Sequence, residues 1–202
     1  MSNQYFENNP NLKHNIETIN YYINGKNIKF YTDNGVFSKK GIDFGSSLLL
    51  KNLKNLDQKT ILDVGCGYGT IGISIAILYP SAQITMLDVN ERALELTRKN
   101  VALNKVDNAT CMESFAYQSV NKKYDVIVTN PPIRAGKKVV HEIILGSIDY
   151  LNDGGELWCV IQKKQGSPSA IKKLEETFGN VQVVTTDKGY QIIKSIKNGL
   201  TN

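Results

Sequence analysis

The chain has 202 residues, 41% of them hydrophobic, with a formal net charge of +5; this length suits one hydrophobic core, so we expect a single domain over residues 1–202. The polar N-terminus and the absence of an apolar run of about 18 residues argue against secretion and against a membrane span. Three widely spaced cysteines and two histidines argue against a disulfide framework and a metal site, which indicates a cytoplasmic protein with reduced thiols.

The first predicted element is a β-hairpin within residues 1–35, ahead of the main fold. Its strands are Thr18–Tyr22 and Lys26–Thr32, which are rich in β-branched and aromatic residues. Asn24-Gly25 between them is a strong signal for a tight hairpin turn. The catalytic core is expected to follow over residues 36–202.

A loop rich in glycine and polar residues comes next, from Val36 to Gly45. It precedes an apolar pattern over Ser46–Leu53 that predicts a helix. Spacing alone leaves two uses for the loop open, an ordinary connection or part of a site.

The most informative segment is TILDVGCGYGTIGI, from Thr60 to Ile73. The apolar run at residues 60–64 predicts a strand buried on both faces, and Thr70–Tyr79 predicts a helix. The glycines between them are expected in a strand-to-helix turn, where backbone approaches a ligand closely. Thr70 occupies the position of the last Gly or Ala in the dinucleotide fingerprint, so the spacing departs from that of NAD enzymes.

Two acidic residues flank this turn. Asp63 precedes the first glycine by two residues, where its carboxylate would repel a pyrophosphate but could hold an ammonium group, directly or through water. Asp88 follows the predicted strand Gln83–Leu87 and lies about twenty residues past the glycines, where nucleotide folds bind ribose hydroxyls. The pattern favours a ligand that is positively charged, lacks phosphate and carries a ribose, and S-adenosylmethionine is such a ligand.

Strands and helices alternate from this turn onwards, which predicts a mostly parallel sheet with helices on both faces. The last two strands are joined by a short turn at Asp187-Lys188-Gly189, and so short a connection makes them antiparallel. The remaining predicted elements are helix Glu91–Asn104, strand Ala109–Met112, strand Tyr124–Thr129, helix Val139–Leu151, strand Glu156–Gln162, helix Ala170–Phe178 and strands Val181–Thr185 and Gln191–Ile196.

The tetrapeptide Asn130-Pro131-Pro132-Ile133 follows a predicted strand, so it is expected in the same crevice as the glycine turn. Its prolines fix two φ angles and give a stiff loop. The side-chain oxygen of Asn130 and the carbonyl of Pro131 could accept both protons of an –NH2 group and turn its lone pair towards a methyl donor. No general base is required beforehand, because alkylation makes the nitrogen acidic.

These motifs together resemble class I S-adenosylmethionine-dependent methyltransferases. The run NPPIRAGK closely resembles a branch of the small ribosomal RNA guanine-N2 methyltransferases, and the loop from Phe37 matches their Phe-Ser-x-x-Gly-x-Asp-x-Gly motif, which closes over the cofactor. The resemblance implies a Rossmann-like fold with a C-terminal antiparallel hairpin and S-adenosylmethionine as the cofactor. It also implies guanine N2 of small-subunit (16S) ribosomal RNA as the acceptor, with ribosomal RNA or the small subunit as the partner.

The resemblance assigns roles to three groups of residues. Asn130, Pro131 and Pro132 form the catalytic group, and Ile133, Arg134 and Lys137 form the substrate-binding group. The cofactor-binding group consists of Phe37, Gly41, Asp43, Gly45, Asp63, Gly65, Cys66, Gly67, Gly69, Asp88, Val89, Asn90, Glu113, Ser114 and Asn130. Further candidate RNA contacts are Lys39, Lys40, Lys138, Lys163 and Lys164.

Three alternatives stay open. Protein glutamine and DNA adenine methyltransferases share the Asn-Pro-Pro core but have an aromatic fourth residue, where this chain has Ile133. A ribosome-assembly protein that binds S-adenosylmethionine or RNA without catalysis is disfavoured by intact Asp63, Asp88 and Asn130. An NAD enzyme is disfavoured by Asp63 and by the glycine spacing.

Overall fold

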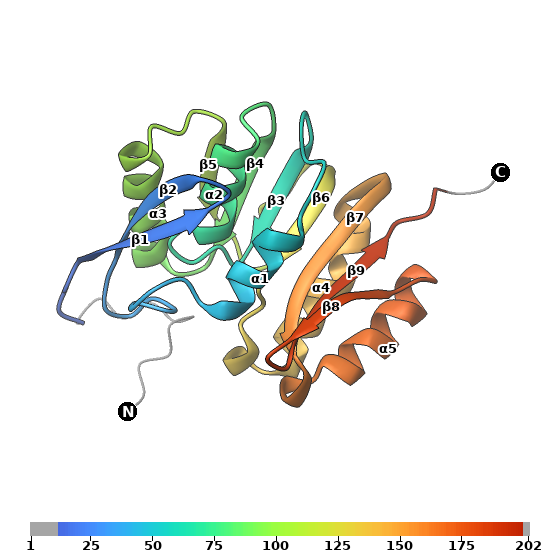
Figure 1. The fold of residues 1–202 in the computed structure, drawn as a ribbon. Helices are drawn as coiled ribbons and strands as arrows, with labels where there is room; N and C mark the ends of the chain where they lie inside the picture. Colours follow the sequence, from blue (N-terminus) through green and yellow to red (C-terminus); the bar gives the residue numbers. More distant parts are fainter. Residues whose placement is uncertain (1–11, 200–202) are drawn as a thin grey trace.

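The fold is given by a computed structural model that describes residues 12–199 (Figure 1). Residues 1–11 of the predicted N-terminal extension and residues 200–202 lie outside the described part. The strands are β1 (Glu17–Ile23), β2 (Lys26–Thr32), β3 (Thr60–Val64), β4 (Gln83–Asp88), β5 (Ala109–Glu113), β6 (Tyr124–Thr129), β7 (Leu151–Gln162), β8 (Gln182–Asp187) and β9 (Tyr190–Ile196). The helices are α1 (Phe44–Asn52), α2 (Thr70–Leu78), α3 (Glu91–Leu103), α4 (Lys137–Gly146) and α5 (Ser167–Phe178), with short 3-10 helices η1 (Ile133–Ala135), η2 (Ser147–Tyr150) and η3 (Lys163–Gln165).

A seven-stranded sheet with the order β5-β4-β3-β6-β7-β9-β8 forms the centre of the fold. Neighbouring strands from β5 to β7 are parallel, whereas β9 runs antiparallel to both β7 and β8. The chain moves outwards from β3 to β5 and then returns to β6 beside β3, so the strand order reverses there. Ligands of open α/β sheets bind outside the carboxyl ends of the strands at this switch point. The predicted Rossmann-like fold with an antiparallel C-terminal pair is confirmed.

Alternating residues of the strands fill one core on each face of the sheet. In β3, Ile61 packs on the side of α1, α2 and α3, whereas Leu62 packs on the side of α4 and α5. In β6, Val126 and Ile127 alternate in the same way. A sheet covered on both faces explains why its strands are continuous apolar runs in the sequence.

The N-terminal hairpin, β1 and β2, has the predicted two-residue turn, with φ angles of 46° and 75° at Asn24-Gly25. The edge of β2 is bound to α3 and its C-terminal cap through two asparagines. Asn100 accepts a hydrogen bond from the backbone of Tyr31 and donates one to it, at 2.6 and 3.0 Å, and Asn104 does the same with Lys29 at 3.2 and 2.7 Å. These side chains take the place of a third strand and attach the hairpin to the main fold.

One predicted helix is too long. The helix expected over Val139–Leu151 ends at Gly146, and β7 begins at Leu151. Leu151 is fully buried and pairs with Tyr124 of β6, so sheet pairing ends the helical segment. The strand expected over Glu156–Gln162 is accordingly longer than predicted.

Another predicted helix is too short. Helix α5 begins at Ser167, three residues before the predicted start. Gly166 precedes it with a left-handed φ of 104°, and Pro168 lies in the first turn, where its missing N–H costs no helical hydrogen bond. Within residues 12–199, no helix is long and apolar enough to cross a membrane.

Candidate active site

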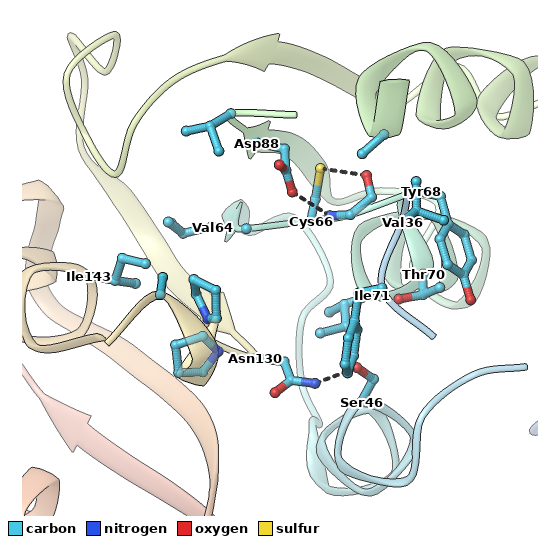
Figure 2. Close-up of a pocket in the computed structure, with 18 of the residues that line it drawn as sticks. Val36, Ser46, Val64, Cys66, Tyr68, Thr70, Ile71, Asp88, Asn130 and Ile143 are labelled. Atoms are coloured by element: carbon cyan, nitrogen blue, oxygen red, sulfur yellow. Dashed lines mark hydrogen bonds between the residues drawn. The ribbon is translucent and has the colours of Figure 1, made fainter. Parts of the chain in front are cut away.

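A cavity of about 370 Å³ lies at the carboxyl ends of β3, β4 and β6 (Figure 2). It is lined by the loop before α1, the glycine turn, the segments after β4 and β5, and the Asn-Pro-Pro loop. The fold thus brings together predicted site residues that are distant in the sequence. The predicted residues that line the cavity are Phe37, Asp43, Gly65, Cys66, Gly67, Asp88, Val89, Ser114, Asn130, Pro131 and Pro132.

The glycine turn presents bare backbone to this cavity. Gly65 and Gly67 have left-handed φ angles of 76° and 58°, which favour glycine. A Cβ atom on Gly67 would meet no protein atom within 4 Å, and one on Gly65 would meet only Pro132 Cδ, at 4.0 Å. The space beside both glycines is open for a ligand to approach the main chain.

Asp88 lies at the end of β4 and lines the cavity. Its Oδ2 accepts the N–H of Gly67 at 2.8 Å and its Oδ1 accepts the N–H of Asn90 at 2.9 Å. Burial raises the pKa of this carboxyl, and the backbone N–H donors counteract part of that effect. Backbone N–H groups of Gly67, Val89 and Asn90 fix the carboxylate in place. Its two oxygens offer about four acceptor sites, so capacity remains for a hydroxyl donor.

Asp63 is fully buried and does not line the cavity. Its Oδ2 accepts the N–H of Gly72 at 2.9 Å, while its Oδ1 has no hydrogen-bond partner among residues 12–199. Gly72 has to be glycine because a Cβ there would lie 2.5 Å from Met86 Cγ and 3.2 Å from Asp63 Oδ2. The Asp63 carboxylate therefore has no direct access to a ligand in the cavity, so the direct form of the predicted ammonium contact is not built into this geometry.

The buried carboxyl of Asp63 makes the stability of the cofactor-free protein depend on pH. Burial, with a smaller contribution from the nearby Asp88 charge, raises its pKa to about 7 from the usual 3.8. The folded state then holds a proton that the unfolded state has lost, so this group's contribution is complete below pH 4 and disappears as the pH rises through 7.

We expect Asp63→Asn to reveal this dependence. Between pH 5 and pH 8, wild type should lose roughly 2 kcal/mol of unfolding free energy relative to the variant, measured by urea denaturation without cofactor. Asp88 is present in both proteins, but its charge raises the pKa of Asp63 in wild type only, so this effect is part of the expected difference. A difference between the two proteins that stays constant from pH 5 to pH 8 would show that Asp63 titrates normally.

The loop before α1 is closed on itself and tied to the glycine turn. Ser38 has a left-handed φ of 55°, its Oγ donates to the Gly41 carbonyl at 2.6 Å, and the Gly41 N–H donates to the Ser38 carbonyl at 3.2 Å. The hydroxyl of buried Tyr68 donates to the same Ser38 carbonyl at 3.1 Å. These bonds hold Phe37, which is 41% exposed, at the wall of the cavity.

The Asn-Pro-Pro loop forms the wall next to α1. The Nδ2 atom of Asn130 donates to Asp43 Oδ2 at 3.1 Å and to Ser46 Oγ at 3.0 Å. Thr129 Oγ1 donates to the Val64 carbonyl at 2.7 Å and fastens the end of β6 to the end of β3. The amide of Asn130 is therefore held at its nitrogen, and its oxygen is left as an acceptor.

The structure gives some predicted cofactor residues other roles. Gly69 is required by packing, because a Cβ there would lie 2.7 Å from Ile73 Cδ1. Asn90 caps α3 by accepting the N–H of Ala93 at 3.2 Å, and Glu113 is exposed. The predicted site residues that do not line the cavity are Gly41, Gly45, Asp63, Gly69, Asn90, Glu113, Ile133, Arg134 and Lys137.

The cavity also has lining residues to which the sequence analysis gave no role. Val139 and Ile143 lie four residues apart on one face of α4 and provide an apolar wall. Their spacing of four residues in the predicted helix indicates that they share a face. It does not indicate that this face lines the cavity. The other unassigned lining residues include Ser46, Tyr68, Ala116 and Ala135.

The residues of the cavity fit the predicted cofactor, S-adenosylmethionine. Open backbone at Gly65 and Gly67 allows close approach, and the Asp88 carboxylate suits a pair of ribose hydroxyls. The unpartnered oxygen of Asp63 suits a bridging water beneath a cationic group. The apolar lining residues Val89, Phe115 and Ala116 suit the flat face of the cofactor's adenine base.

Comparisons with known proteins identify the family of this chain. A family model described as methyltransferase small domain matches residues 27–194. The chain is 48% identical over 200 residues to an uncharacterized protein of Bacillus subtilis, YbxB, covering 98% of this chain and 100% of that protein. It is 34% identical over 180 residues to ribosomal RNA small subunit methyltransferase C of Salmonella choleraesuis, covering 87% of this chain and 51% of that protein. The chain thus spans about half the length of the curated ribosomal RNA methyltransferases it matches.

Solved structures share the fold. The 16S rRNA N2 G1207 methyltransferase RsmC of T. thermophilus, in complex with AdoMet and guanosine, superposes with a TM-score of 0.83 at 24% identity, covering 94% of this chain and 52% of that one. The ribosomal protein L11 methylase of Lactobacillus delbrueckii superposes with a TM-score of 0.64 at 20% identity, covering 76% and 77%. Enzymes with different acceptors share this architecture, so the fold alone does not define the substrate.

The family match extends over most of the chain, from β2 to β9. It covers the glycine turn, the Asp88 carboxylate and the Asn-Pro-Pro loop, all of which line one cavity. The predicted cofactor is the methyl donor of this family. The chain belongs to the methyltransferase small domain family and is an S-adenosylmethionine-dependent methyltransferase.

Proposed function

We propose that this enzyme methylates an exocyclic amine, namely N2 of a guanine in small-subunit ribosomal RNA. The observation that carries the proposal is the amide of Asn130. Because its nitrogen donates to Asp43 and Ser46, its oxygen is left to accept a hydrogen from a substrate amine. The Pro131 carbonyl provides a second acceptor, and a primary amine has two hydrogens to donate.

The amine acceptor determines the chemistry that the site has to perform. When bound, S-adenosylmethionine supplies a methyl group activated by a sulfonium. The lone pair of the substrate nitrogen forms the new N–C bond, the electron pair of the broken C–S bond stays on sulfur, and the alkylated nitrogen releases one proton to water. Two acceptors that fix the amine serve this reaction by alignment, which can contribute on the order of 7 to 11 kcal/mol.

Guanine is favoured over adenine or a protein amide by the fourth residue of the loop. Ile133 is partly buried and packs against the core that contains α4, whereas the DNA adenine and protein glutamine enzymes stack their target on an aromatic at that place. Curated relatives at 32% to 34% identity are named ribosomal RNA small subunit methyltransferase C.

A cationic border beside the cavity supports RNA as the substrate. Arg134 and Lys137 are exposed on η1 and α4, directly after the Asn-Pro-Pro loop. The N–H of Lys163, on η3, donates to Gly189 at 2.7 Å, so η3 adjoins the β8–β9 turn. Lys188 in that turn lies 4.7 Å from the ring centroid of Phe44 at the start of α1. These cations form no ion pair with any residue in 12–199, which leaves them for phosphates.

We expect the double variant Arg134→Ala, Lys137→Ala to bind RNA more weakly than wild type. The slope of log affinity against log salt should become shallower by about 1.4, since each phosphate contact to a single strand contributes about 0.7. Fluorescence anisotropy with a labelled ribosomal RNA fragment at several salt concentrations measures it. Lys59 and Lys123, which precede the amino ends of β3 and β6, provide the matched control pair. An equal slope change in both pairs would mean that net charge, and not this border, binds RNA.

The acceptor class itself is tested by competition among substrates. Purified protein with labelled S-adenosylmethionine is offered small ribosomal subunits, naked small-subunit RNA, duplex DNA and ribosomal protein. We expect label in RNA only. Label in protein or DNA would replace the proposed acceptor with one of the other amino methyltransferase substrates. Cofactor binding with no label in any acceptor would favour an assembly protein without catalysis.

A further inference from the structure

Asn130 is held in position by two residues of the segment that begins α1. Asp43 is the N-cap of this helix, and its carboxylate accepts the backbone N–H groups of Gly45 at 2.9 Å and of Ser46 at 3.3 Å. Ser46 is 3% exposed. Both Asp43 and Ser46 also accept a hydrogen bond from the Nδ2 group of Asn130. Asn130 is 87 residues away from Asp43 in the sequence. Figure 2 shows Asn130 with its nitrogen towards Ser46 and its oxygen turned away.

The chemistry of these partners determines which way the amide points. A carboxylate only accepts hydrogen bonds, so the side of Asn130 that faces Asp43 must be the –NH2 group. Without this constraint the amide could rotate by 180° and present a donor to the cavity. A donor there would repel a substrate amine, because both groups would offer hydrogens to each other.

Gly45 protects this arrangement. A Cβ atom on Gly45 would lie 3.1 Å from Asp43 Oδ1 and 3.1 Å from the ring of Tyr190. Any side chain there would therefore press on the carboxylate that caps the helix. The glycine of the Asp-x-Gly pattern thus maintains the Asp43 cap, and it does not line the cavity.

We infer that Asp43 and Ser46 are positioning residues for methyl transfer, and that they act through Asn130. They keep its amide oxygen directed at the substrate amine. When the amine nitrogen becomes positively charged on alkylation, its N–H donates more strongly to the Asn130 oxygen, and the Asp43 charge on the far side of the amide reinforces that bond. This inference rests on the proposed transfer to an exocyclic amine.

Two substitutions test the inference. Ser46→Ala removes one acceptor for the amide, and we expect single-turnover methyl transfer to slow by about 5- to 10-fold. Asp43→Asn keeps a good helix N-cap, but its oxygen is needed by the backbone N–H groups of Gly45 and Ser46. Its –NH2 would then face the –NH2 of Asn130, so the Asn130 amide should rotate, and we expect a loss of about 100-fold. Ser46→Thr retains the hydroxyl and should keep most of the wild-type rate.

Ser47 gives the matched control. It is the neighbour of Ser46, and its Oγ accepts the hydroxyl of Tyr21 on the N-terminal hairpin at 3.0 Å. Ser47→Ala removes a hydrogen bond of the same kind from the same helix without touching Asn130. The transfer rate of this variant should equal that of wild type.

A readout that does not depend on activity separates this inference from the proposed function. The side-chain –NH2 resonances of Asn130, assigned by their loss in Asn130→Ala, should shift in Ser46→Ala and Asp43→Asn and stay in place in Ser47→Ala. Affinity for S-adenosylhomocysteine should remain within about 2-fold of wild type in all variants. Unchanged resonances with a wild-type rate in Ser46→Ala would overturn the inference. A selective loss of cofactor affinity in Asp43→Asn would overturn it in favour of direct cofactor binding by Asp43. If the resonances shift in Ser46→Ala and Asp43→Asn but the enzyme methylates another acceptor, the positioning of Asn130 by these two residues would be confirmed and the proposed substrate would be rejected.

Discussion

Asn130→Ala is expected to slow methyl transfer by about 30- to 1,000-fold, a loss of roughly 2 to 4 kcal/mol of transition-state stabilisation. The substitution removes the oxygen that we propose aligns the substrate amine, together with the hydrogen bonds that the Asn130 nitrogen donates to Asp43 and Ser46. Asp63 and Asp88, which belong to the cofactor region, are left intact. Single-turnover transfer with labelled S-adenosylmethionine measures the rate.

Cofactor affinity is the control for this result. Binding of S-adenosylhomocysteine to Asn130→Ala should stay near the wild-type value, since the loss concerns the reactive geometry of the amine. Thermal unfolding checks that the variant is folded. Transfer at the wild-type rate would exclude the alignment role. A parallel drop in rate and cofactor affinity would instead identify Asn130 as a cofactor contact.

The second large effect is expected at Asp88. Asp88→Ala should weaken cofactor binding by about 1 to 3 kcal/mol, or roughly 5- to 150-fold, because buried ribose hydroxyls are left without an acceptor. It also frees the N–H of Gly67, which the carboxylate accepts at 2.8 Å, so the glycine turn loses part of its support. Calorimetric titration with S-adenosylhomocysteine measures this affinity.

Glu113 provides the matched control for Asp88. It pairs with Asp88 across β4 and β5, yet it is exposed and does not line the cavity. Glu113→Ala should bind the cofactor as wild type does. A loss at Glu113 equal to that at Asp88 would mean that the adenine end of the ligand extends beyond the cavity described above. NAD should bind neither the wild type nor the Glu113→Ala variant. Binding of NAD would contradict the assignment of the cofactor.

The parts of the site that sequence predicts well are those set by local geometry. A buried strand, three glycines and a helix within Thr60–Tyr79 can form only a strand-to-helix turn. The position of Asp88 follows because the next strand ends beside the first, and that of Asn130 because β6 ends beside β3. Parallel strands place their carboxyl ends at one edge of the sheet, so the sequence alone predicts that these residues meet in one crevice.

The parts that sequence missed depend on long-range contacts. The bond between Asp43 and Asn130 joins residues 87 positions apart, and nothing in the spacing of either motif indicates it. Gly72 looks like an unfavourable residue within a helix, but the structure shows that it makes room for Met86 and donates to Asp63. The end of α4 was misplaced because pairing of Leu151 with Tyr124 overrides helical preference.

The most direct test of the whole account is the identity of the methylated atom. Small ribosomal subunits from cells lacking this enzyme are incubated with the purified protein and labelled S-adenosylmethionine, and the RNA is digested for nucleoside mass spectrometry. The account predicts that the label appears in N2-methylguanosine and is strongly reduced with Asn130→Ala. A methyl group on a ribose oxygen or a ring carbon, or RNA that remains unlabelled while another acceptor is methylated, would contradict it.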